Sequence, residues 1–555
     1  MTDLIKRLWA KDPGLWSEDK KEQNAVANRL GWLDGVDFLE KNLGLLNALA
    51  AEVKKQHFSQ TVLLGMGGSS LCPYLFSTIF GSAPKYPQLM VLDSTDPDYI
   101  RQIHARINIS QTLFILASKS GVTIEPDSLF KYFYTCLQEK KLHPADHFLA
   151  ITDPDTDLHK MAQQQDFAYI FTNPANIGGR YSALTFFGLI PAALIGVNLK
   201  LILESVQSMR KACQSSVEAE NPAWELARYL MDCLSQGRNK LTLLTDSSLT
   251  PFALWLEQLI AESTGKKGAG IIPIVAEPVG NVKEYGNDRC FVSITMTGQD
   301  DKHRHDFIQQ LSANNFPVKE YLLPNLYSLA GEFLRWEIAT ALCGHFMEIN
   351  PFDEPDVAAS KYNTRRILEH FTTYGKMPGE ISGRKSGFSW HYSDQLRQPV
   401  KDSQVNDLLA GLNKLLTGIP QNGYFALLAY LPHSFDVEEK AGKIRELIRK
   451  KTGCATLFGF GPRYLHSSGQ LFKGGPDNGV FLILSRGEGC ASPSDKEGLE
   501  IPGEPYNFDQ LQYAQALGDF QALDDLGRPA IHLGVGKDYL SALTRLLDLI
   551  EQALM

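Results

Sequence analysis

Cysteine pairs, secretion signals and repeats are all missing from this sequence. Its eight cysteines are scattered over 555 residues and form no CxxC pair, which argues against a disulfide framework and against a zinc site. The first residues are interrupted by charged side chains and contain no apolar segment like that of a secretion signal. No short-period repeat or low-complexity tract is present. These absences favour a globular protein of a reducing cytoplasm, without a metal or an organic cofactor.

Strong net charge and long apolar runs are also scarce. The formal net charge of -9 is small for a chain of this length and does not indicate a basic surface that would bind nucleic acid or an anionic membrane. The longest uncharged stretch, 181–199, contains a proline and an asparagine. We favour a buried helix there over a membrane span, because no second such segment exists. We therefore expect neither a nucleic-acid partner nor a membrane.

Short apolar runs that end in small polar residues recur along the chain and predict an α/β protein. Such strands, each feeding a helix, are typical of βαβ units and parallel sheets. The first set lies at 61–64, 89–92, 113–117 and 148–151, the second at 241–244, 271–275, 290–295 and 318–323. A third set lies at 425–431, 456–460, 480–484 and 530–534.

The order of these segments predicts two doubly wound parallel-sheet domains between two further parts. Residues 1–55 alternate charged and apolar side chains at helical spacing and predict a helical lead-in. The two doubly wound domains are expected over 56–215 and 216–372. Residues 373–400 are rich in Gly, Ser and Lys and predict a linker, after which 401–555 form a smaller α/β C-terminal extension.

The most informative segment follows the apolar run 113–117. It reads Ser118-Lys119-Ser120-Gly121-Val122-Thr123, and the residues after it favour the first turn of a helix. Backbone N–H groups at a helix start, beside hydroxyls and a cation, form a phosphate site. An ordinary polar turn between a strand and a helix is the alternative interpretation.

Two further segments have glycines beside polar side chains. Gly67-Gly68-Ser69 follows the first strand, and its glycines would let a ligand approach the backbone. The segment does not match the GxGxxG motif of dinucleotide-binding proteins, because Ser70 stands at the position of the last glycine. Arg180 follows a Gly-Gly pair and could stabilise an enediolate oxygen. The alternative interpretations are a tight turn between a strand and a helix for Gly67-Gly68-Ser69, and a paired structural charge for Arg180.

Three single residues complete the candidates. Glu262 lies near the end of a helix that should stop at Gly265; the negative helix end raises a carboxylate pKa, which suits a general base. Lys361 lies in a helix that begins near Pro355, and His466 follows an apolar strand. Taken alone, these residues would be a surface carboxylate, a solvated lysine and a structural histidine.

Together these segments resemble the glucose-6-phosphate isomerase family, which is built from two sugar-isomerase (SIS) domains. The resemblance covers most of 60–365, with the motifs in the family's order. The matching motifs are Gly67-Gly68-Ser69, Ser118-Lys119-Ser120 with Thr123, Gly178-Gly179-Arg180-Tyr181-Ser182, Glu262-Ser263-Thr264-Gly265-Lys266, and Asn350-Pro351-Phe352-Asp353 with Lys361. The whole chain most resembles the isomerase half of bifunctional transaldolase/glucose-6-phosphate isomerase fusions, including the lead-in around 29–34 and the extension around 461–466.

The resemblance implies an aldose–ketose isomerase of glycolysis and gluconeogenesis that interconverts glucose 6-phosphate and fructose 6-phosphate through a cis-enediolate. It implies that Glu262 is the base, that Arg180 stabilises the intermediate, and that Lys361 assists ring opening. The sugar phosphate would be bound by Gly68, Ser69, Ser118, Lys119, Ser120 and Thr123. Two alternatives stay open, a non-catalytic SIS sensor of sugar phosphates and an isomerase that also accepts mannose 6-phosphate. Family members are usually dimers, so a homodimer is possible.

The sequence departs from the family at two positions. The region 277–285 holds no catalytic histidine, so we expect His466, in Leu465-His466-Ser467-Ser468-Gly469-Gln470, to supply it from a displaced position, with Tyr285 as the fallback. Glu354 stands where the family usually has a substrate-binding glutamine. A carboxylate would repel a phosphate, so we expect Glu354 to point away or to be countered by a lysine.

Overall fold

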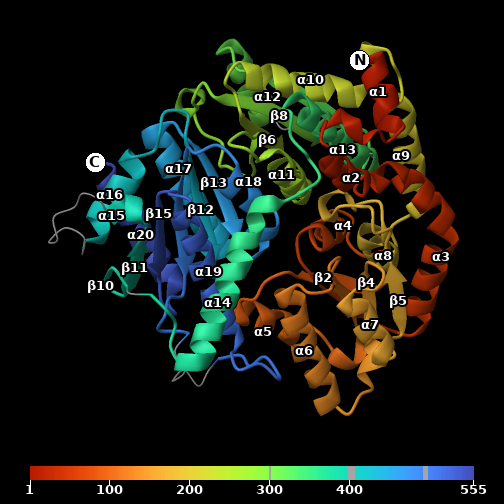
Figure 1. The fold of residues 1–555 in the computed structure, drawn as a ribbon, viewed down its shortest axis with the longest axis horizontal. Helices are drawn as coiled ribbons and strands as arrows, with labels where there is room; N and C mark the ends of the chain where they lie inside the picture. Colours follow the sequence, from red (N-terminus) through yellow and green to blue (C-terminus); the bar gives the residue numbers. More distant parts are fainter. Residues whose placement is uncertain (299–301, 380, 398–406, 492–497) are drawn as a thin grey trace.

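The structure is a computed structural model that describes residues 1–298, 302–379, 381–397, 407–491 and 498–555. The predicted lead-in consists of helices α1 (Thr2–Trp9), α2 (Lys20–Ala27) and α3 (Gly35–Lys55). They lie along the right-hand edge of the molecule in Figure 1, at the first and second domains. Trp16 Nε1 donates a hydrogen bond to the carbonyl oxygen of Ala341, at 2.8 Å, so the lead-in is fixed to the second domain.

The first domain is built on a five-stranded parallel sheet in the order β2-β1-β3-β4-β5. Its strands are β1 (Gln60–Gly65), β2 (Gln88–Leu92), β3 (Thr112–Ala117), β4 (Phe148–Thr152) and β5 (Tyr169–Thr172). Its helices are α4 (Leu71–Ile79), α5 (Pro97–Arg106), α6 (Ile124–Glu139), α7 (Asp157–Gln164), α8 (Phe186–Leu194) and α9 (Leu199–Cys213).

Alternate residues of these strands pack on opposite faces, as expected for a sheet covered on both sides. Leu63, Ile115 and Leu149 belong to the core shared with α3, α4 and α8, whereas Leu64 and Phe114 belong to the core shared with α5, α6 and α7. The strand order reverses between β1 and β3, and ligands of such sheets bind at this point, beyond the carboxyl ends of the strands. The turns after β1 and β3 are therefore the ones placed to form a site.

The second domain has a four-stranded parallel sheet in the order β7-β6-β8-β9. Its strands are β6 (Lys240–Thr245), β7 (Ile272–Ile274), β8 (Arg289–Met296) and β9 (Val318–Leu323). Its helices are α10 (Pro222–Ser235), α11 (Thr250–Thr264), α12 (Lys302–Ala313), α13 (Ser328–Phe346) and α14 (Ala358–Tyr374). The prediction of two doubly wound parallel sheets is confirmed.

The C-terminal part has a six-stranded mixed sheet in the order β10-β11-β15-β14-β12-β13. The strands are β10 (Gly383–Lys385), β11 (Phe388–Tyr392), β12 (Tyr424–Tyr430), β13 (Ala455–Phe460), β14 (Gly479–Ser485) and β15 (Ala530–Gly534). Its helices are α15 (Asp394–Arg397), α16 (Leu408–Thr417), α17 (Phe435–Thr452), α18 (Gly469–Gly474), α19 (Phe508–Asp525) and α20 (Tyr539–Ala553). The predicted α/β extension is confirmed.

The expectation of a plain linker over 373–400 is wrong for its central part. β11 pairs antiparallel with β15, and β10 pairs antiparallel with β11. Buried Phe388, Trp390 and Tyr392 join the core of the C-terminal sheet. Hydrophobic alternation over these few residues was outweighed in the sequence by the surrounding Gly, Ser and Lys. Residues 380 and 398–400 of this segment lie outside the described residues.

The C-terminal part packs closely against both doubly wound domains (Figure 1). α14 runs down the middle of the molecule against α19, and α18 lies against α11. The core that covers one face of the first sheet continues into residues of the C-terminal part, including Tyr464, Phe472 and Leu517. This packing brings the segment that carries His466 between the two doubly wound domains.

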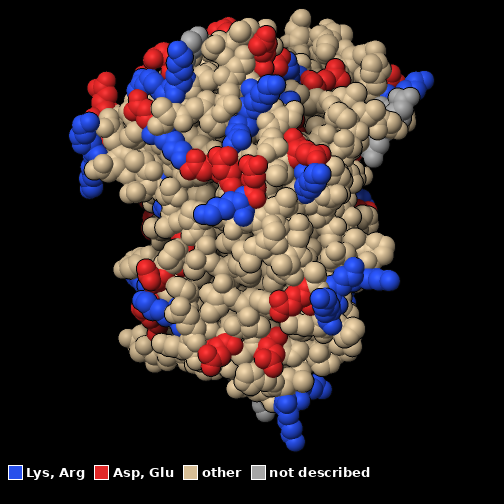
Figure 2. Space-filling view, turned by 90° about the vertical axis from the view of Figure 1, so that its right-hand side faces the viewer, with Lys and Arg blue, Asp and Glu red and all other residues tan. Residues whose placement is uncertain are grey.

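The surface that carries the lead-in shows no concentration of one charge. Figure 2 views the molecule from the right-hand side of Figure 1, and basic and acidic side chains are interspersed there with wide uncharged areas. None of the described helices is both long enough and apolar enough to cross a bilayer. The predicted buried helix within 181–199 is α8, whose residues are all buried.

Candidate active site

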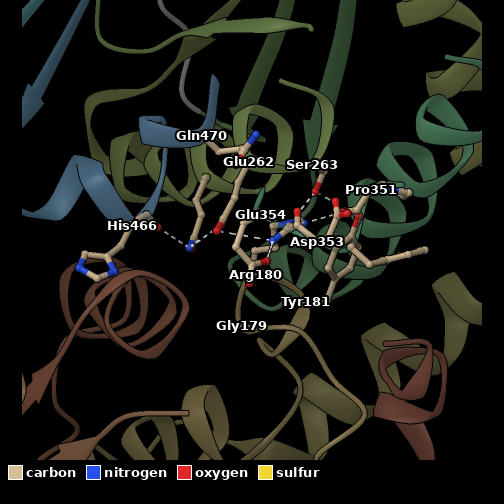
Figure 3. A network of polar contacts seen from close by, with 12 residues as sticks. Gly179, Arg180, Tyr181, Glu262, Ser263, Pro351, Asp353, Glu354, His466 and Gln470 are labelled. Atoms are coloured by element: carbon tan, nitrogen blue, oxygen red, sulfur yellow. Dashed lines mark hydrogen bonds and ion pairs between the residues drawn. The ribbon is translucent and has the colours of Figure 1, made fainter. Parts of the chain in front are cut away.

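Glu262 lies at the buried C-terminal end of α11, whose last turn is followed by Gly265 as predicted. Its side chain is directed towards Arg180 of the first domain rather than to solvent, and the residue is 9% exposed. Gln258, one turn earlier, donates through Nε2 to Glu262 Oε2 at 3.2 Å and to the carbonyl oxygen of His466 at 2.7 Å. A single amide group therefore links the predicted base to the C-terminal part (Figure 3).

Arg180 faces Glu262 from the opposite side and is 2% exposed. Its Nη1 lies 3.5 Å from Glu262 Oε1, and its Nε donates to Ser263 Oγ at 2.8 Å. Its Nη2 donates to the carbonyl oxygens of Pro351 and Asp353, at 2.8 and 2.7 Å. These bonds hold the guanidinium group in one orientation beside the carboxylate (Figure 3).

The segment that binds Arg180 is itself fixed. Phe352 is buried against the rings of Trp16 and Tyr181. Lys266, just after α11, donates to the carbonyl oxygen of Asn350 at 2.5 Å and pairs with Asp353 Oδ1 at 2.8 Å. Burial lowers the pKa of Lys266 to about 8. The site therefore contains two buried cations, Arg180 and Lys266, beside Glu262.

The pKa of Glu262 is raised to about 7, mainly because the carboxylate is buried. Arg180 opposes this rise in pKa, and the nearby Glu354 adds to it. The predicted direction is therefore confirmed, but desolvation is its leading cause, whereas we had expected the helix end to produce it. A carboxyl group with this pKa can exchange a proton near neutral pH.

Glu354 does not point away from the site, and its main partner is an arginine: Oε2 accepts a hydrogen bond from Arg180 Nη1 at 3.0 Å. Burial raises the pKa of Glu354, but the positive charges of Arg180, Arg29 and Lys266 together outweigh burial, so the net pKa is lowered. The expected lysine, Lys266, is therefore one of three cations that counter this carboxylate. Arg180 therefore interacts with two carboxylates, of which Glu354 is the more exposed, with 40% of its side chain accessible.

The turn after β1 packs directly against these elements. A Cβ added to Gly68 would lie 2.1 Å from the carbonyl oxygen of Gly179, and one added to Gly67 would lie 2.8 Å from that of His466. Gly67 also has a φ of +57°, which favours glycine. Ser69 is buried at 7% exposure. The two glycines thus let the turn approach the backbones beside Arg180 and His466.

The hydroxyl groups of the turn after β3 converge on Thr123, directly before α6. Thr123 Oγ1 lies 3.2 Å from Ser118 Oγ and 3.4 Å from Ser120 Oγ. Lys119 is directed elsewhere: it forms an ion pair with Asp153 and donates to the carbonyl oxygen of Ala175 at 3.3 Å. The three hydroxyl groups therefore lie together at the start of α6, as expected, whereas Lys119 is paired with Asp153.

A cavity of 520 Å³ adjoins this turn, and the described residues outline its walls. Ser120 and Thr123 line it from the first domain, Lys361 from α14, and His466 from the C-terminal part. Ser118 lines a separate cavity of 120 Å³ on the other side of the turn. Lys119, Gly68, Ser69, Arg180 and Glu262 are not among the residues that outline the larger cavity. His466 connects the cavity with the cluster around Glu262, since His466 lines the cavity and its carbonyl oxygen accepts a hydrogen bond from Gln258.

The imidazole ring of His466 points away from Glu262 and towards α6 (Figure 3). Its Nε2 lies 3.3 Å from Oε1 of Glu125, in the first turn of α6. Gln515 of α19 donates to the same carboxylate oxygen at 2.8 Å. Burial raises the pKa of Glu125, but His466 and, more weakly, Lys361 outweigh it, so the net pKa is lowered. Glu125 is thus an ionised partner of His466.

The sequence analysis missed Glu125, Gln258 and Gln515. Glu125 was noted only as a residue suited to a first helical turn, and no local pattern pairs it with a histidine 341 positions away. Tyr285, the fallback for His466, lies elsewhere: its hydroxyl accepts from the Gly280 N–H at 3.0 Å, and its ring packs near Arg449.

Comparisons with known proteins agree with this arrangement. Residues 51–285 match the model of the phosphoglucose isomerase family. A glucose-6-phosphate isomerase of Campylobacter jejuni is 28% identical over 361 residues, which make up 57% of this chain and 86% of that protein. One of Trichormus variabilis is 33% identical over 271 residues, 48% of this chain and 50% of that protein. Over residues 51–285 the chain is therefore similar to the phosphoglucose isomerase family.

A solved glucose-6-phosphate isomerase shares the fold of about two thirds of this chain. The crystal structure of a glucose-6-phosphate isomerase from Chlamydia trachomatis aligns with a TM-score of 0.51 and 20% identity, over 67% of this chain and 84% of that chain. The family match includes Arg180, Glu262 and the Ser118–Thr123 turn. It ends before Lys361 and His466, and the resemblance to bifunctional transaldolase fusions stays a prediction.

Proposed function

We propose that this protein interconverts glucose 6-phosphate and fructose 6-phosphate by moving a proton between carbons 1 and 2. One observation carries the proposal: a buried carboxylate with a pKa of about 7, Glu262, lies 3.5 Å from a buried arginine. Such a pair can remove a proton next to a carbonyl and stabilise the oxyanion that forms. A coupled assay that detects fructose 6-phosphate formed from glucose 6-phosphate tests this activity.

In this proposal the phosphate group binds at the start of α6. Ser120 and Thr123 present hydroxyls to the 520 Å³ cavity, and the first N–H groups of α6 add the positive end of the helix. Ser118 supports Thr123 from behind, and Lys119, held by Asp153, contributes charge rather than a direct contact. The sugar would then extend past His466 towards Gly68, Ser69 and Glu262.

Ring opening is assigned to His466, with Lys361 at the same cavity. If Nε2 donates to Glu125, Nδ1 is left as an acceptor for the sugar hydroxyl proton. Glu262 would then take the proton from carbon 2 and return it to carbon 1. Arg180 would stabilise the cis-enediolate, whose oxygen would replace Glu354, the more exposed partner, at Nη1.

We expect Glu125→Gln to lower kcat for the ring-closed sugar by about 10- to 100-fold, because a neutral amide no longer provides the carboxylate that orients the His466 ring. Steady-state kinetics on the cyclic sugar and on an analogue that cannot close its ring measure this effect, which should be much smaller on the analogue. Glu139→Gln, at the exposed end of the same helix, is the control and should behave as wild type. Equal losses on both substrates would contradict the assignment.

We expect Glu354→Gln to move the acid limb of the pH profile of kcat/KM to lower pH. The negative charge of Glu354 contributes to the raised pKa of Glu262, so its removal lowers that pKa and keeps the base ionised in more acidic solution. The profile of kcat/KM reports ionisations of the free enzyme. Exposed Glu348 provides the control variant Glu348→Gln. A limb that stays in place, or moves to higher pH, would exclude this coupling.

Other properties of the chain remain predictions. A cytoplasmic location is supported by eight cysteines that are all free. A homodimer is supported only by the family resemblance.

A further inference from the structure

A second cavity lies behind the turn that carries His466, and we call it the rear cavity. Its volume is 320 Å³, and residues of α4, α11, α17, β13 and the turn Arg463–His466 line it. Tyr464 and Ser467 form part of its wall, whereas Leu465 and His466 line the 520 Å³ cavity. One short turn therefore separates the rear cavity from the proposed active site.

Glu257 contributes a buried carboxylate to the rear cavity. It is 7% exposed and projects from α11. Its carboxylate is hydrogen-bonded to the Ser468 side chain, while Arg445 and Arg463 act on it only through space. Within the described part of the chain, no ion pair joins Glu257 to either arginine. Burial raises the pKa of Glu257 to about 7, as expected for a buried carboxylate without an ion-pair partner.

The two arginines are engaged by other groups. Arg445 donates to the carbonyl oxygens of Ala276, Val275 and Thr456, at 2.8, 2.9 and 2.7 Å. Arg463 donates to both carboxylate oxygens of Asp93, at 2.7 Å each. A second carboxylate, Glu438 of α17, lines the cavity, and burial also raises its pKa. The phenol of Tyr74 completes the titratable groups from α4.

The remaining wall is largely apolar. It is formed by aliphatic and aromatic side chains from three elements, namely Leu71, Leu254, Phe458 and Phe460. A ligand that suits this cavity therefore has an apolar body and one positively charged group. An ammonium group would pair with the buried carboxylate of Glu257, and aromatic rings favour a cation beside them.

We propose that the rear cavity is an effector site for a small organic amine, whose ammonium group pairs with Glu257 and whose apolar body packs against Phe458 and Phe460. Its occupant contacts Tyr464 and Ser467 and so holds the turn that presents His466 to the sugar. Binding depends on the rear cavity alone. The effect on turnover rests on the proposed isomerase function.

Benzylamine is a suitable probe, with benzyl alcohol as an uncharged compound of the same shape. Isothermal titration at about pH 8 should give a Kd of about 1 mM for benzylamine, typical of a ligand of this size. Glu257→Gln should weaken its binding by about 10-fold or more. Glu439→Gln, on α17 next to Glu438 but paired with Lys443 on the surface, is the control and should bind as wild type. Glu438→Gln serves as the second test variant if Glu257→Gln does not fold.

Binding of benzylamine should weaken as the pH falls through about 7, because protonation of Glu257 removes the charge that the ammonium group needs. Any of three results would overturn the site. Benzyl alcohol could bind as tightly as benzylamine, benzylamine could bind Glu257→Gln and wild type equally well, or no binding of benzylamine could be detected.

The coupled assay tests the effector role separately. Saturating benzylamine should raise kcat/KM on the cyclic sugar by about 2-fold or more in wild type, through a better ordered His466, and should have no such effect in Glu257→Gln. If benzylamine bound without raising kcat/KM, the effector role would be overturned and the binding site would stand. An enzyme that shows no isomerase activity, yet binds benzylamine through Glu257, would refute the proposed function and leave the amine site standing.

Discussion

Glu262→Gln is expected to lower kcat by about 10²- to 10⁴-fold with little change in KM, because it removes the group that transfers the proton and leaves substrate contacts in place. The amide keeps the shape of the side chain and can still accept from Gln258 Nε2, which lies 3.2 Å from Oε2. It also keeps a polar neighbour for Arg180. Steady-state kinetics in the coupled assay, together with a titration of fructose 6-phosphate binding, measure the two effects.

The control for this variant is Glu332→Gln. Glu332 on α13 is also buried, and burial raises its pKa to about 7 as well. Its ion pair is with Arg335, 3.4 Å away and outside the site. Turnover by this variant should stay close to wild type. If Glu262→Gln turned over substrate as fast as wild type, Glu262 could not be the base.

The second large effect is expected from His466→Ala. Removal of the imidazole should slow turnover of the ring-closed sugar by about 10²-fold or more, because no other described group at the 520 Å³ cavity pairs an acceptor nitrogen with an ionised carboxylate. Turnover of an analogue that lacks the ring-forming hydroxyl should fall much less. The difference between the two substrates separates ring opening from proton transfer at carbon 2.

His159→Ala is the control for this experiment. His159 belongs to α7, away from the cavity, and its Nδ1 accepts only from the nearby Asp155 N–H, at 3.1 Å. Equal losses on the cyclic sugar and the open-chain analogue would remove the ring-opening role from His466. Unchanged turnover of both would remove His466 from the mechanism.

The parallel sheets could be predicted because their strands carry the information locally. Runs such as Leu113–Ala117 are wholly buried and end in small polar residues, and both features are visible in the sequence. β5 was missed because its four residues are only partly buried at a sheet edge. β11 was missed because the surrounding Gly, Ser and Lys outweighed its short hydrophobic alternation, and because its partner β15 lies about 140 positions later.

The candidate site was predicted in part, for a similar reason. Arg180 and Glu262 stand in segments that resemble a family, and the structure brings them within 3.5 Å. The contacts that connect this pair with His466 could not be predicted from the sequence, because the Gln258–His466 and Glu125–His466 contacts span 208 and 341 positions. The dominant cause of the raised pKa of Glu262 was likewise hidden, since desolvation depends on how three domains pack around one helix end.

The most direct test of this account is a crystal structure with an open-chain sugar-acid phosphate that mimics the enediolate. The account predicts that the phosphate contacts Ser120 and Thr123, that the Glu262 carboxylate faces the first two carbons, and that His466 of the same chain lies beside the sugar. A ligand bound with its carbons away from Glu262, or approached by no group of the C-terminal part, would contradict it.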